Sequence, residues 1–403
     1  MGEDLQKVFL PFNFASMRSL LVLLFVFSFI LVYAQGDSIP KAIEVDFLFN
    51  YYEQEGIHSA VTGGQGTEEL TDRAGKIVVS VPLDSVQSLK AQTDINHYTS
   101  ASTDKIDSYV SSASRRDSRA SLQIGYQRKW GSQYEAGVGA GMSVESDYLS
   151  KSLTANWGWL SKDENRSLGI QAQAYFDTWI VIFPEELRAP GLVSVPTDRR
   201  RSFNLAANWG QVINPKVQAS IGAELVVQQG LLSTPFHRVY FQNESLPRIE
   251  KFPLWRLKYP IGLRLNWFAT DWLVLRSYYR YYFDNFDIQA HTIRLEVPLK
   301  LHLSLTLLPY YRFHTQTAAY FFAPFNEHVN GVDYWTSDFD LSAFQSHRFG
   351  AGIRFAPLYG LARFRAGNKR VAMLKSLSLR YGHYRRSDGL SANILGLNLS
   401  WKL

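Results

Sequence analysis

The stretch Tyr259–Lys300 reads YPIGLRLNWFATDWLVLRSYYRYYFDNFDIQAHTIRLEVPLK, and it contains three successive segments in which apolar and polar side chains alternate. Alternation with a period of two is the pattern of a β-strand that has two unlike faces. Each segment has about ten residues, and its polar face carries arginines, which a packed protein core rarely accepts. Long strands with one apolar and one charged face are typical of an outer-membrane β-barrel, with lipid outside and water inside.

The same alternation continues along the chain and predicts about sixteen antiparallel strands. A soluble β-sandwich would have strands of about 5–6 residues, and it would bury the charged faces in a dry core. We therefore expect an all-β fold, a closed transmembrane β-barrel. The expected strands cover residues 43–51, 76–81, 86–98, 120–130, 134–144, 153–159, 168–176, 203–209, 217–227, 261–267, 273–283, 291–299, 301–315, 347–355, 377–381 and 395–403.

The loop lengths support this strand count. Each long loop follows an odd-numbered strand, whereas the turns after even-numbered strands are short, except for the segment 358–372. Short periplasmic turns and long extracellular loops are the rule in outer-membrane barrels. Both ends of the barrel chain are therefore expected on the periplasmic side.

The composition excludes several classes of protein. The mean hydropathy of −0.15 excludes a bundle of transmembrane helices. The net charge of +6 is spread through the strands rather than gathered in one arm, so we do not expect nucleic-acid binding. There is no cysteine, which excludes disulfides, thiolate metal sites and lipid attachment through cysteine.

An apolar run near the N-terminus has the features of a secretory signal peptide. Arg18 precedes the apolar segment Ser19–Val32, and Ala34 stands immediately before the expected cut. An uncleaved membrane anchor is disfavoured because the apolar segment is short. We expect a signal peptide with an N-terminal extension over residues 1–34, and one barrel domain over residues 35–403, exported to the bacterial outer membrane.

The charged side chains on the polar face change sign along the chain. Over the first nine strands they are mostly acidic, namely Glu44, Asp46, Asp94, Glu135, Glu145, Asp177 and Glu224. Over the last seven they are mostly basic, namely Arg264, Arg276, Arg280, Arg294, Arg348, Arg354 and Arg380, with Glu296 as the exception. If the barrel closes, these residues are expected to form an acidic wall and a basic wall around a water-filled lumen.

Two functional interpretations use these residues. Opposed charged walls produce a transverse field in a pore that passes small hydrophilic solutes, with passive or weakly selective transport as the function. Alternatively, the charges pair with one another or with an inserted loop, and the plugged barrel serves as a structural or partner-docking scaffold. The oligomeric state, monomer or trimer, is left open.

Carboxylates in the loops are candidate Ca²⁺ ligands, although their spacing is not that of an EF-hand, so solvated side chains are the favoured interpretation. They are Glu68, Glu69, Asp72, Asp104, Asp107 and Asp117. Basic residues at the loop bases are expected to contact lipopolysaccharide phosphates. They are Arg115, Arg116, Arg119, Arg199, Arg200 and Arg201.

An outer-membrane lipid-modifying enzyme is the third functional possibility. Such an enzyme needs an outward-facing serine and histidine on adjacent strands, and Ser277 and His291 are the nearest candidates. With a tight turn near Asn285, their register is several residues apart. We therefore expect no enzyme activity, no catalytic residues and no cofactor or metal.

Two loop motifs resemble those of a family of uncharacterised outer-membrane proteins of Bacteroidota-type bacteria, classed as a domain of unknown function. The motifs are HSAVTGGQGTEELTD at His58–Asp72 and YTSASTDKID…VSSASRRD at Tyr98–Asp117. The resemblance covers nearly the whole chain after the signal peptide, and it implies an outer-membrane barrel but no substrate. The chain ends in Trp401-Lys402-Leu403 rather than in phenylalanine, and the last strand is expected to be the contact for the barrel assembly machinery.

Overall fold

The computed structural model describes residues 42–99, 116–188, 196–366 and 370–403. The predicted signal peptide over residues 1–34 and the candidate ligands Asp104 and Asp107 lie outside these ranges, as does Arg115. Among the described residues, no helix is long and apolar enough to cross a membrane.

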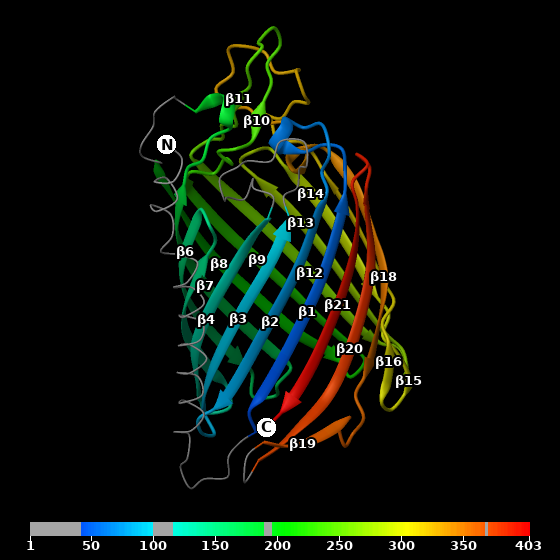
Figure 1. The fold of residues 1–403 in the computed structure, drawn as a ribbon. Helices are drawn as coiled ribbons and strands as arrows, with labels where there is room; N and C mark the ends of the chain where they lie inside the picture. Colours follow the sequence, from blue (N-terminus) through cyan, green and yellow to red (C-terminus); the bar gives the residue numbers. More distant parts are fainter. Residues whose placement is uncertain (1–41, 100–115, 189–195, 367–369) are drawn as a thin grey trace.

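One antiparallel sheet closes on itself, because β1 pairs with β2 on one side and with β21 on the other (Figure 1). The chain therefore forms the predicted all-β barrel. The spanning strands are β1 (Glu44–Glu55), β2 (Leu70–Pro82), β3 (Gln87–Thr99), β4 (Arg116–Trp130), β5 (Tyr134–Val144), β6 (Tyr148–Leu160), β7 (Arg166–Ile180), β8 (Thr197–Asn214), β9 (Val217–Gly230), β12 (Trp255–Phe268), β13 (Val274–Asp284), β14 (Gln289–Glu296) with β15 (Leu299–His302), β16 (Leu305–Leu307) with β17 (Tyr310–Gln316), β18 (Phe344–Phe355), β20 (Arg370–Arg386) and β21 (Ser391–Lys402).

The sheet has 19 strands, but these make sixteen spans, as predicted. Pro298 interrupts one span between β14 and β15, and Pro309 interrupts the next between β16 and β17. Proline has no N–H to donate to the ladder, which explains both breaks. The remaining strand, β19 (Ala362–Ala366), pairs only with the first residues of β20.

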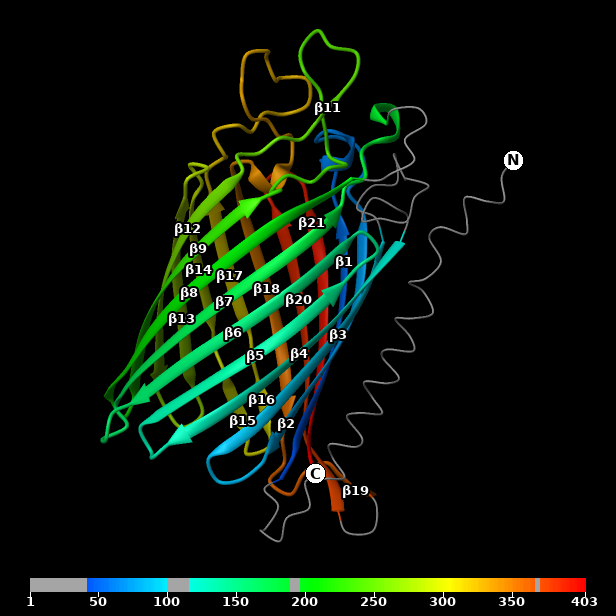
Figure 2. The ribbon, with the colours of Figure 1, turned by 90° about the vertical axis from the view of Figure 1, so that its left-hand side faces the viewer.

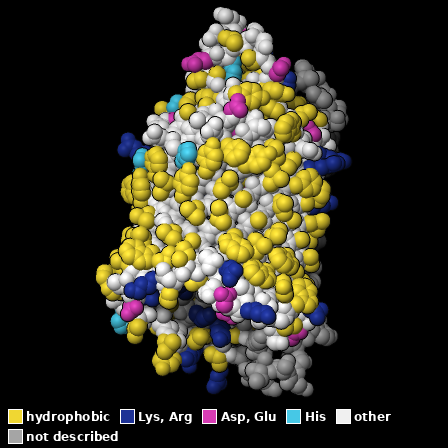
Figure 3. Space-filling view, turned by 180° about the vertical axis from the view of Figure 1, so that it is seen from behind, with side chains coloured by type: hydrophobic (Ala, Val, Ile, Leu, Met, Phe, Trp, Pro, Cys, Tyr) yellow, Lys and Arg dark blue, Asp and Glu magenta, His cyan; other side chains and the backbone are white. Residues whose placement is uncertain are grey.

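The outer surface of the barrel is apolar. The side chains predicted to face lipid, such as Phe49, Leu263 and Ile293, are among the large hydrophobic residues that are exposed. Figure 3 shows hydrophobic side chains in a broad band across the face of the barrel that it draws, with most of the lysine and arginine side chains toward the two ends. An apolar surface that surrounds the molecule is stable in lipid rather than in water.

Long loops gather at one end of the barrel and short turns at the other (Figure 2). The long loops contain η2 (Ala60–Thr62), η3 (Glu185–Leu187), the hairpin of β10 (Arg238–Val239) and β11 (Arg248–Ile249), and η4 (Phe339–Leu341). Phe241, Phe286 and Val239 are completely buried there, so the loops pack against one another into an ordered cap. We call this end the outer mouth.

Several predicted boundaries need correction. The strands extend further than the alternation indicated, so Asp72 lies in β2 and Asp117 lies in β4 rather than in loops. The predicted turn 358–372 is also shorter, because β19 forms a hairpin with β20 inside it. Side chains near the ends of these strands are polar on both faces, which removes the alternation at the water-exposed rim.

Candidate functional site: the barrel lumen and its outer mouth

Strand register shows which side chains share the inner face. Residues directly opposite each other on antiparallel strands point to the same side of the sheet. Starting from Arg294 on β14, the opposite residue on β17 is Arg312, and the residue opposite Arg312 on β18 is Arg348. Three arginines therefore lie side by side on three adjacent strands and face the lumen.

Glu296 is a carboxylate that Arg294 shares with two arginines of other strands, Arg276 and Arg380. Its Oε1 lies 3.1 Å from Arg276 Nη1, and its Oε2 lies 2.8 Å from Arg294 Nη2 and 3.1 Å from Arg380 Nη2. The Glu296 side chain is 8% exposed, whereas those of the three arginines are 39–52% exposed. One nearly buried negative charge thus holds three partly hydrated positive charges in place.

The ring of Tyr310 on β17 lies beside three arginines, two of which also pair with Glu296. The guanidinium carbons of Arg294, Arg348 and Arg380 lie 5.7, 5.6 and 5.3 Å from the ring centroid, within the range of cation–π attraction. The ring fits because glycine stands beside it, since a Cβ at Gly382 would lie 2.1 Å from the Tyr310 hydroxyl oxygen. The basic wall is therefore built around two centres, Glu296 and Tyr310.

The remaining predicted basic-wall residues lie on the same face. Arg264 and Arg280 are placed against the rings of Tyr278 and Tyr282, at 5.2 and 5.8 Å from the ring centroids. Arg354 lines a pocket of about 360 Å³ at the end of the barrel opposite the outer mouth. Within the described residues, none of these three arginines forms an ion pair.

The predicted acidic wall carries less net charge than its carboxylates suggest. Four of its seven members have a basic partner. The partner lies on the same half of the barrel or, for Glu44, near the pairing of β1 with β21 that closes the barrel. The pairs are Glu44 with Lys375 at 3.1 Å, Asp94 with Lys76 at 2.9 Å, Glu145 with Arg119 at 3.7 Å and Asp177 with Arg200 at 2.9 Å. The charges of these four pairs cancel locally.

The other three acidic residues are placed differently. Asp46 accepts a hydrogen bond from Ser400 at 2.5 Å, and Glu44 and Asp46 line the same pocket as Arg354. β1 is next to β21 in the closed barrel, so these two carboxylates stand beside the basic wall rather than opposite it. Glu135 and Glu224 face the lumen without an ion pair among the described residues.

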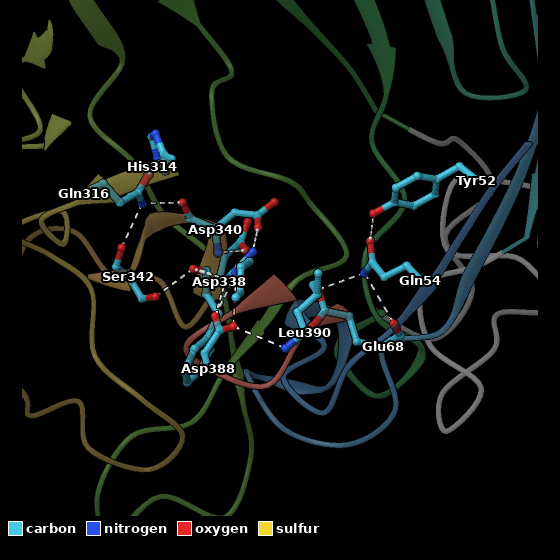
Figure 4. Close-up of polar contacts among 12 residues, drawn as sticks. Tyr52, Gln54, Glu68, His314, Gln316, Asp338, Asp340, Ser342, Asp388 and Leu390 are labelled. Carbon is cyan, nitrogen blue, oxygen red and sulfur yellow. Dashed lines mark hydrogen bonds and ion pairs between the residues drawn. The ribbon is translucent and has the colours of Figure 1, made fainter. Parts of the chain in front are cut away.

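At the outer mouth, η4 is attached to the end of β20. The nearly buried Arg386, 4% exposed, pairs with Asp388 and with Asp340 of η4, and it also donates to the carbonyl oxygen of Phe339 at 2.8 Å. From β17, Gln316 Nε2 donates to the carbonyl oxygens of Asp340 and Ser342 at 3.0 and 2.8 Å (Figure 4). The loop between β17 and β18 therefore folds onto the mouth.

The loop between β1 and β2 meets η4 from the other side. The ring of His58 stacks on Phe339 with centroids 3.8 Å apart. Gln54 Nε2 donates to Glu68 Oε1 at 3.2 Å, and the Tyr52 hydroxyl donates to Gln54 (Figure 4). Burial, and then the nearby Asp340 carboxylate, raise the pKa of Glu68 to about 7.

The four candidate Ca²⁺ ligands that the structure describes do not come together. Glu68 lies at the mouth near η4, Glu69 is exposed, and Asp72 accepts a hydrogen bond from Asn96. Asp117 belongs to a different cluster, in which one carboxylate oxygen each of Asp117, Glu145 and Asp147 lies within 4.8 Å of the others.

The arginines predicted at the bases of the loops point to different faces of the barrel sheet. Arg200 faces inward and pairs with Asp177, and Arg119 faces inward toward Ser143 and Glu145. Arg199 and Arg201 alternate with Arg200, so they point outward at the rim.

Ser277 and His291 are not brought together. Ser277 is opposite Leu295, four residues from His291, and its hydroxyl donates to the Leu265 carbonyl oxygen at 3.3 Å. His291 instead has the hydroxyl of Tyr279 at 2.8 Å from its Nδ1.

The sequence interpretation missed three residues of the lumen and mouth: Arg312, Tyr310 and Arg386. Arg312 continues the alternation between Leu301 and Thr315, and that signal was available. Tyr310 stands at an inward position by the same alternation, but an aromatic residue alone does not indicate its face. Arg386 lies at the end of a strand, where alternation no longer separates the faces.

A closed antiparallel barrel with an apolar outer band and a charged lumen defines the class of outer-membrane-type β-barrels. Residues 44–357 match the family described as "Protein of unknown function (DUF3570)", and the chain belongs to this family. No curated protein matches the chain.

Several solved structures are similar to this chain at low identity. The siderophore receptor PirA from Pseudomonas aeruginosa is 12% identical with a TM-score of 0.43, over 86% of this chain and 57% of that chain. A mutant of the ferric enterobactin receptor (PfeA) from Pseudomonas aeruginosa is 11% identical with a TM-score of 0.46, over 86% and 54%. A bacterial polysaccharide outer membrane secretin is 9% identical with a TM-score of 0.46, over 91% and 100%. The chain spans little more than half the length of the receptors, and likenesses at this level carry no information about a solute.

Proposed function

We propose that this protein is a pore of the bacterial outer membrane that passes small hydrophilic solutes, with a preference for anions. The observation that carries the proposal is the row of Arg294, Arg312 and Arg348, which stand directly opposite one another on adjacent strands. Like charges directly opposite each other destabilise a sheet. Residues that lower stability in this way are expected at sites that carry a function.

The energetics of the row favour anions in the lumen. Two unit charges 4 Å apart repel by about 1 kcal/mol in water and by about 4 kcal/mol at an effective dielectric constant of 20. Of these three arginines, only Arg294 pairs with Glu296, and the buried Nε of Arg348 has no hydrogen-bond partner among the described residues. An anion that enters the lumen offsets this repulsion, whereas a cation adds to it.

The proposed surroundings follow from the outer surface. Arg199 and Arg201 point outward at the rim of the outer mouth, where lipopolysaccharide phosphates are the expected contact. The last strand, β21, closes the barrel against β1 and is the proposed recognition element for the barrel assembly machinery.

A plugged barrel that acts as a structural or docking scaffold is the second candidate. One observation favours it: η4 folds onto the mouth, where Asp340 pairs with the nearly buried Arg386. In this case the arginine row stabilises the barrel interior through Glu296 and Tyr310. The barrel then passes no ions. A lipid-modifying enzyme gains no support, because Ser277 and His291 are held apart.

The zero-current potential under a KCl gradient tests the pore proposal. Replacing Arg280 by glutamate is expected to shift this potential toward cation preference. Arg280 has no ion pair among the described residues, so the change breaks no existing pair. A change of two charge units about 10 Å from the ion path is worth about 0.8 kcal/mol in water, unfavourable for an anion and favourable for a cation. The anion-to-cation permeability ratio should therefore fall by roughly 17-fold at low salt, and by less where salt screens the charge.

The matched control is Arg385→Glu, the same change at an exposed arginine of β20. Arg385 stands opposite His347 on the lipid-facing side, so its replacement should leave the permeability ratio unchanged. An equal shift in both variants would contradict a selective lumen. A folded barrel that gives no current with either Arg280 or Glu at this position would favour the scaffold.

A further inference from the structure

Three side chains with metal-ligating atoms converge in the loops above the outer mouth. His237 precedes β10 and Glu250 follows β11, so both belong to the loop between β9 and β12. Asp338 comes from the loop between β17 and β18, where it is the N-cap of η4. One ligand atom from each of the three lies within 4.8 Å of the others.

The geometry between His237 and Glu250 fits a shared ion better than a direct bond. His237 Nδ1 lies 3.5 Å from Glu250 Oε1, but this nitrogen is buried and makes no hydrogen bond within the described residues. Two ligands of one tetrahedral zinc ion, each about 2.1 Å from the metal, are about 3.4 Å apart. The observed separation is therefore that of two ligands of one ion.

The charges in the cluster lack a compensating basic side chain. The Glu250 side chain is 1% exposed, and Asp338 is half-buried beside it. Within the described parts of the chain, neither carboxylate pairs with a lysine or an arginine. The neighbouring Lys251 instead lies over the rings of Trp335 and Tyr334. Even with a protonated His237, two carboxylates leave the cluster one negative charge in excess.

The carboxylates are also oriented by neighbours, as ligands in metal sites usually are. The Thr336 hydroxyl donates to Glu250 Oε1 at 2.5 Å, and the Thr234 N–H donates to Glu250 Oε2 at 2.8 Å. The Asp340 N–H donates to Asp338 Oδ1 at 2.9 Å. These bonds fix the side chains without using the His237 Nδ1 lone pair.

We propose that His237, Glu250 and Asp338 form a binding site for one divalent transition-metal ion, with Zn²⁺ as the representative ion. One imidazole nitrogen and two carboxylate oxygens are ligands that zinc accepts, and water completes the coordination. Calcium and magnesium are disfavoured because they prefer oxygen ligands alone.

The ion would add a link between two loops that the backbone hydrogen bonds between Lys251 and Trp335 already join. Asp338 begins η4, and Asp340 in the same turn pairs with Arg386 at the end of β20. A metal bound to Asp338 would therefore fasten η4 and the β10–β11 loop to each other above the mouth. The site does not depend on whether the lumen conducts.

Binding of Zn²⁺ to the folded full-length barrel in detergent micelles, measured by isothermal titration calorimetry, tests the proposal. We expect one saturable site per chain, and Co²⁺ bound at the same site should give a visible d–d absorption band. Glu250→Gln and His237→Ala should each weaken binding by about 100-fold or more. A difference in migration between the unheated and the heated sample in a denaturing gel shows that each variant is folded.

The matched control is Asp117→Asn, which removes a carboxylate from the separate cluster with Glu145 and Asp147. It should leave the affinity and the cobalt spectrum unchanged. The proposal is overturned if the folded barrel shows no saturable binding, if His237→Ala binds as the unchanged protein does, or if Asp117→Asn abolishes binding.

Discussion

Replacing Glu296 by glutamine is expected to lower the free energy of unfolding by about 2–3 kcal/mol and to strengthen the preference for anions. The change removes the carboxylate that pairs with Arg276, Arg294 and Arg380. Breaking a buried pair costs about 3–5 kcal/mol, and the value here is lower because the arginines are partly hydrated. Urea unfolding in lipid vesicles, followed by tryptophan fluorescence, measures the loss.

The control for this prediction is Glu224→Gln. Glu224 is an exposed lumenal carboxylate, so its replacement removes the same charge without breaking an ion pair among the described residues. We expect its effect to stay within about 0.5 kcal/mol. If both variants lose the same stability, Glu296 is not the centre of the basic wall.

Replacing Arg312 by glutamate is expected to act in the opposite direction, raising the free energy of unfolding by about 1–2 kcal/mol. Arg312 stands between Arg294 and Arg348, so a carboxylate at this position turns two repulsive neighbours into two attractive ones. The same urea titration measures the gain, and the zero-current potential should move toward cation preference.

Arg312→Gln separates the two contributions. It removes the repulsion without adding an attraction, so about half of the stability gain is expected. A loss of stability in Arg312→Glu would show that the arginine row is not under mutual repulsion, and it would remove the main support for an anion-preferring lumen.

Side-chain alternation is sufficient to predict the barrel, the spans and the lipid-facing residues. It works for strands such as β12, because lipid outside and water inside impose unlike faces on every other residue. It fails at the rim, where both faces meet water, and for this reason the prediction of loops at Asp72 and Asp117 is wrong. The outer mouth is built by irregular loops, for which no period exists.

The charge pattern is only partly predictable. The sequence identifies lumenal arginines such as Arg294 and Arg348, but their convergence on Glu296 and Tyr310 depends on register across strands distant in the chain. The predicted acidic wall rests on carboxylates alone. Lys76 and Arg200 neutralise Asp94 and Asp177, and such partners become visible only when the strands are paired.

Single-channel conductance of the refolded barrel in a planar lipid bilayer tests the central claim most directly. The account predicts steady current steps that increase with KCl concentration, and a zero-current potential that shows anion preference under a salt gradient. A correctly folded, bilayer-inserted barrel that gives no current steps would contradict the pore and would leave the loop-capped scaffold as the function to test.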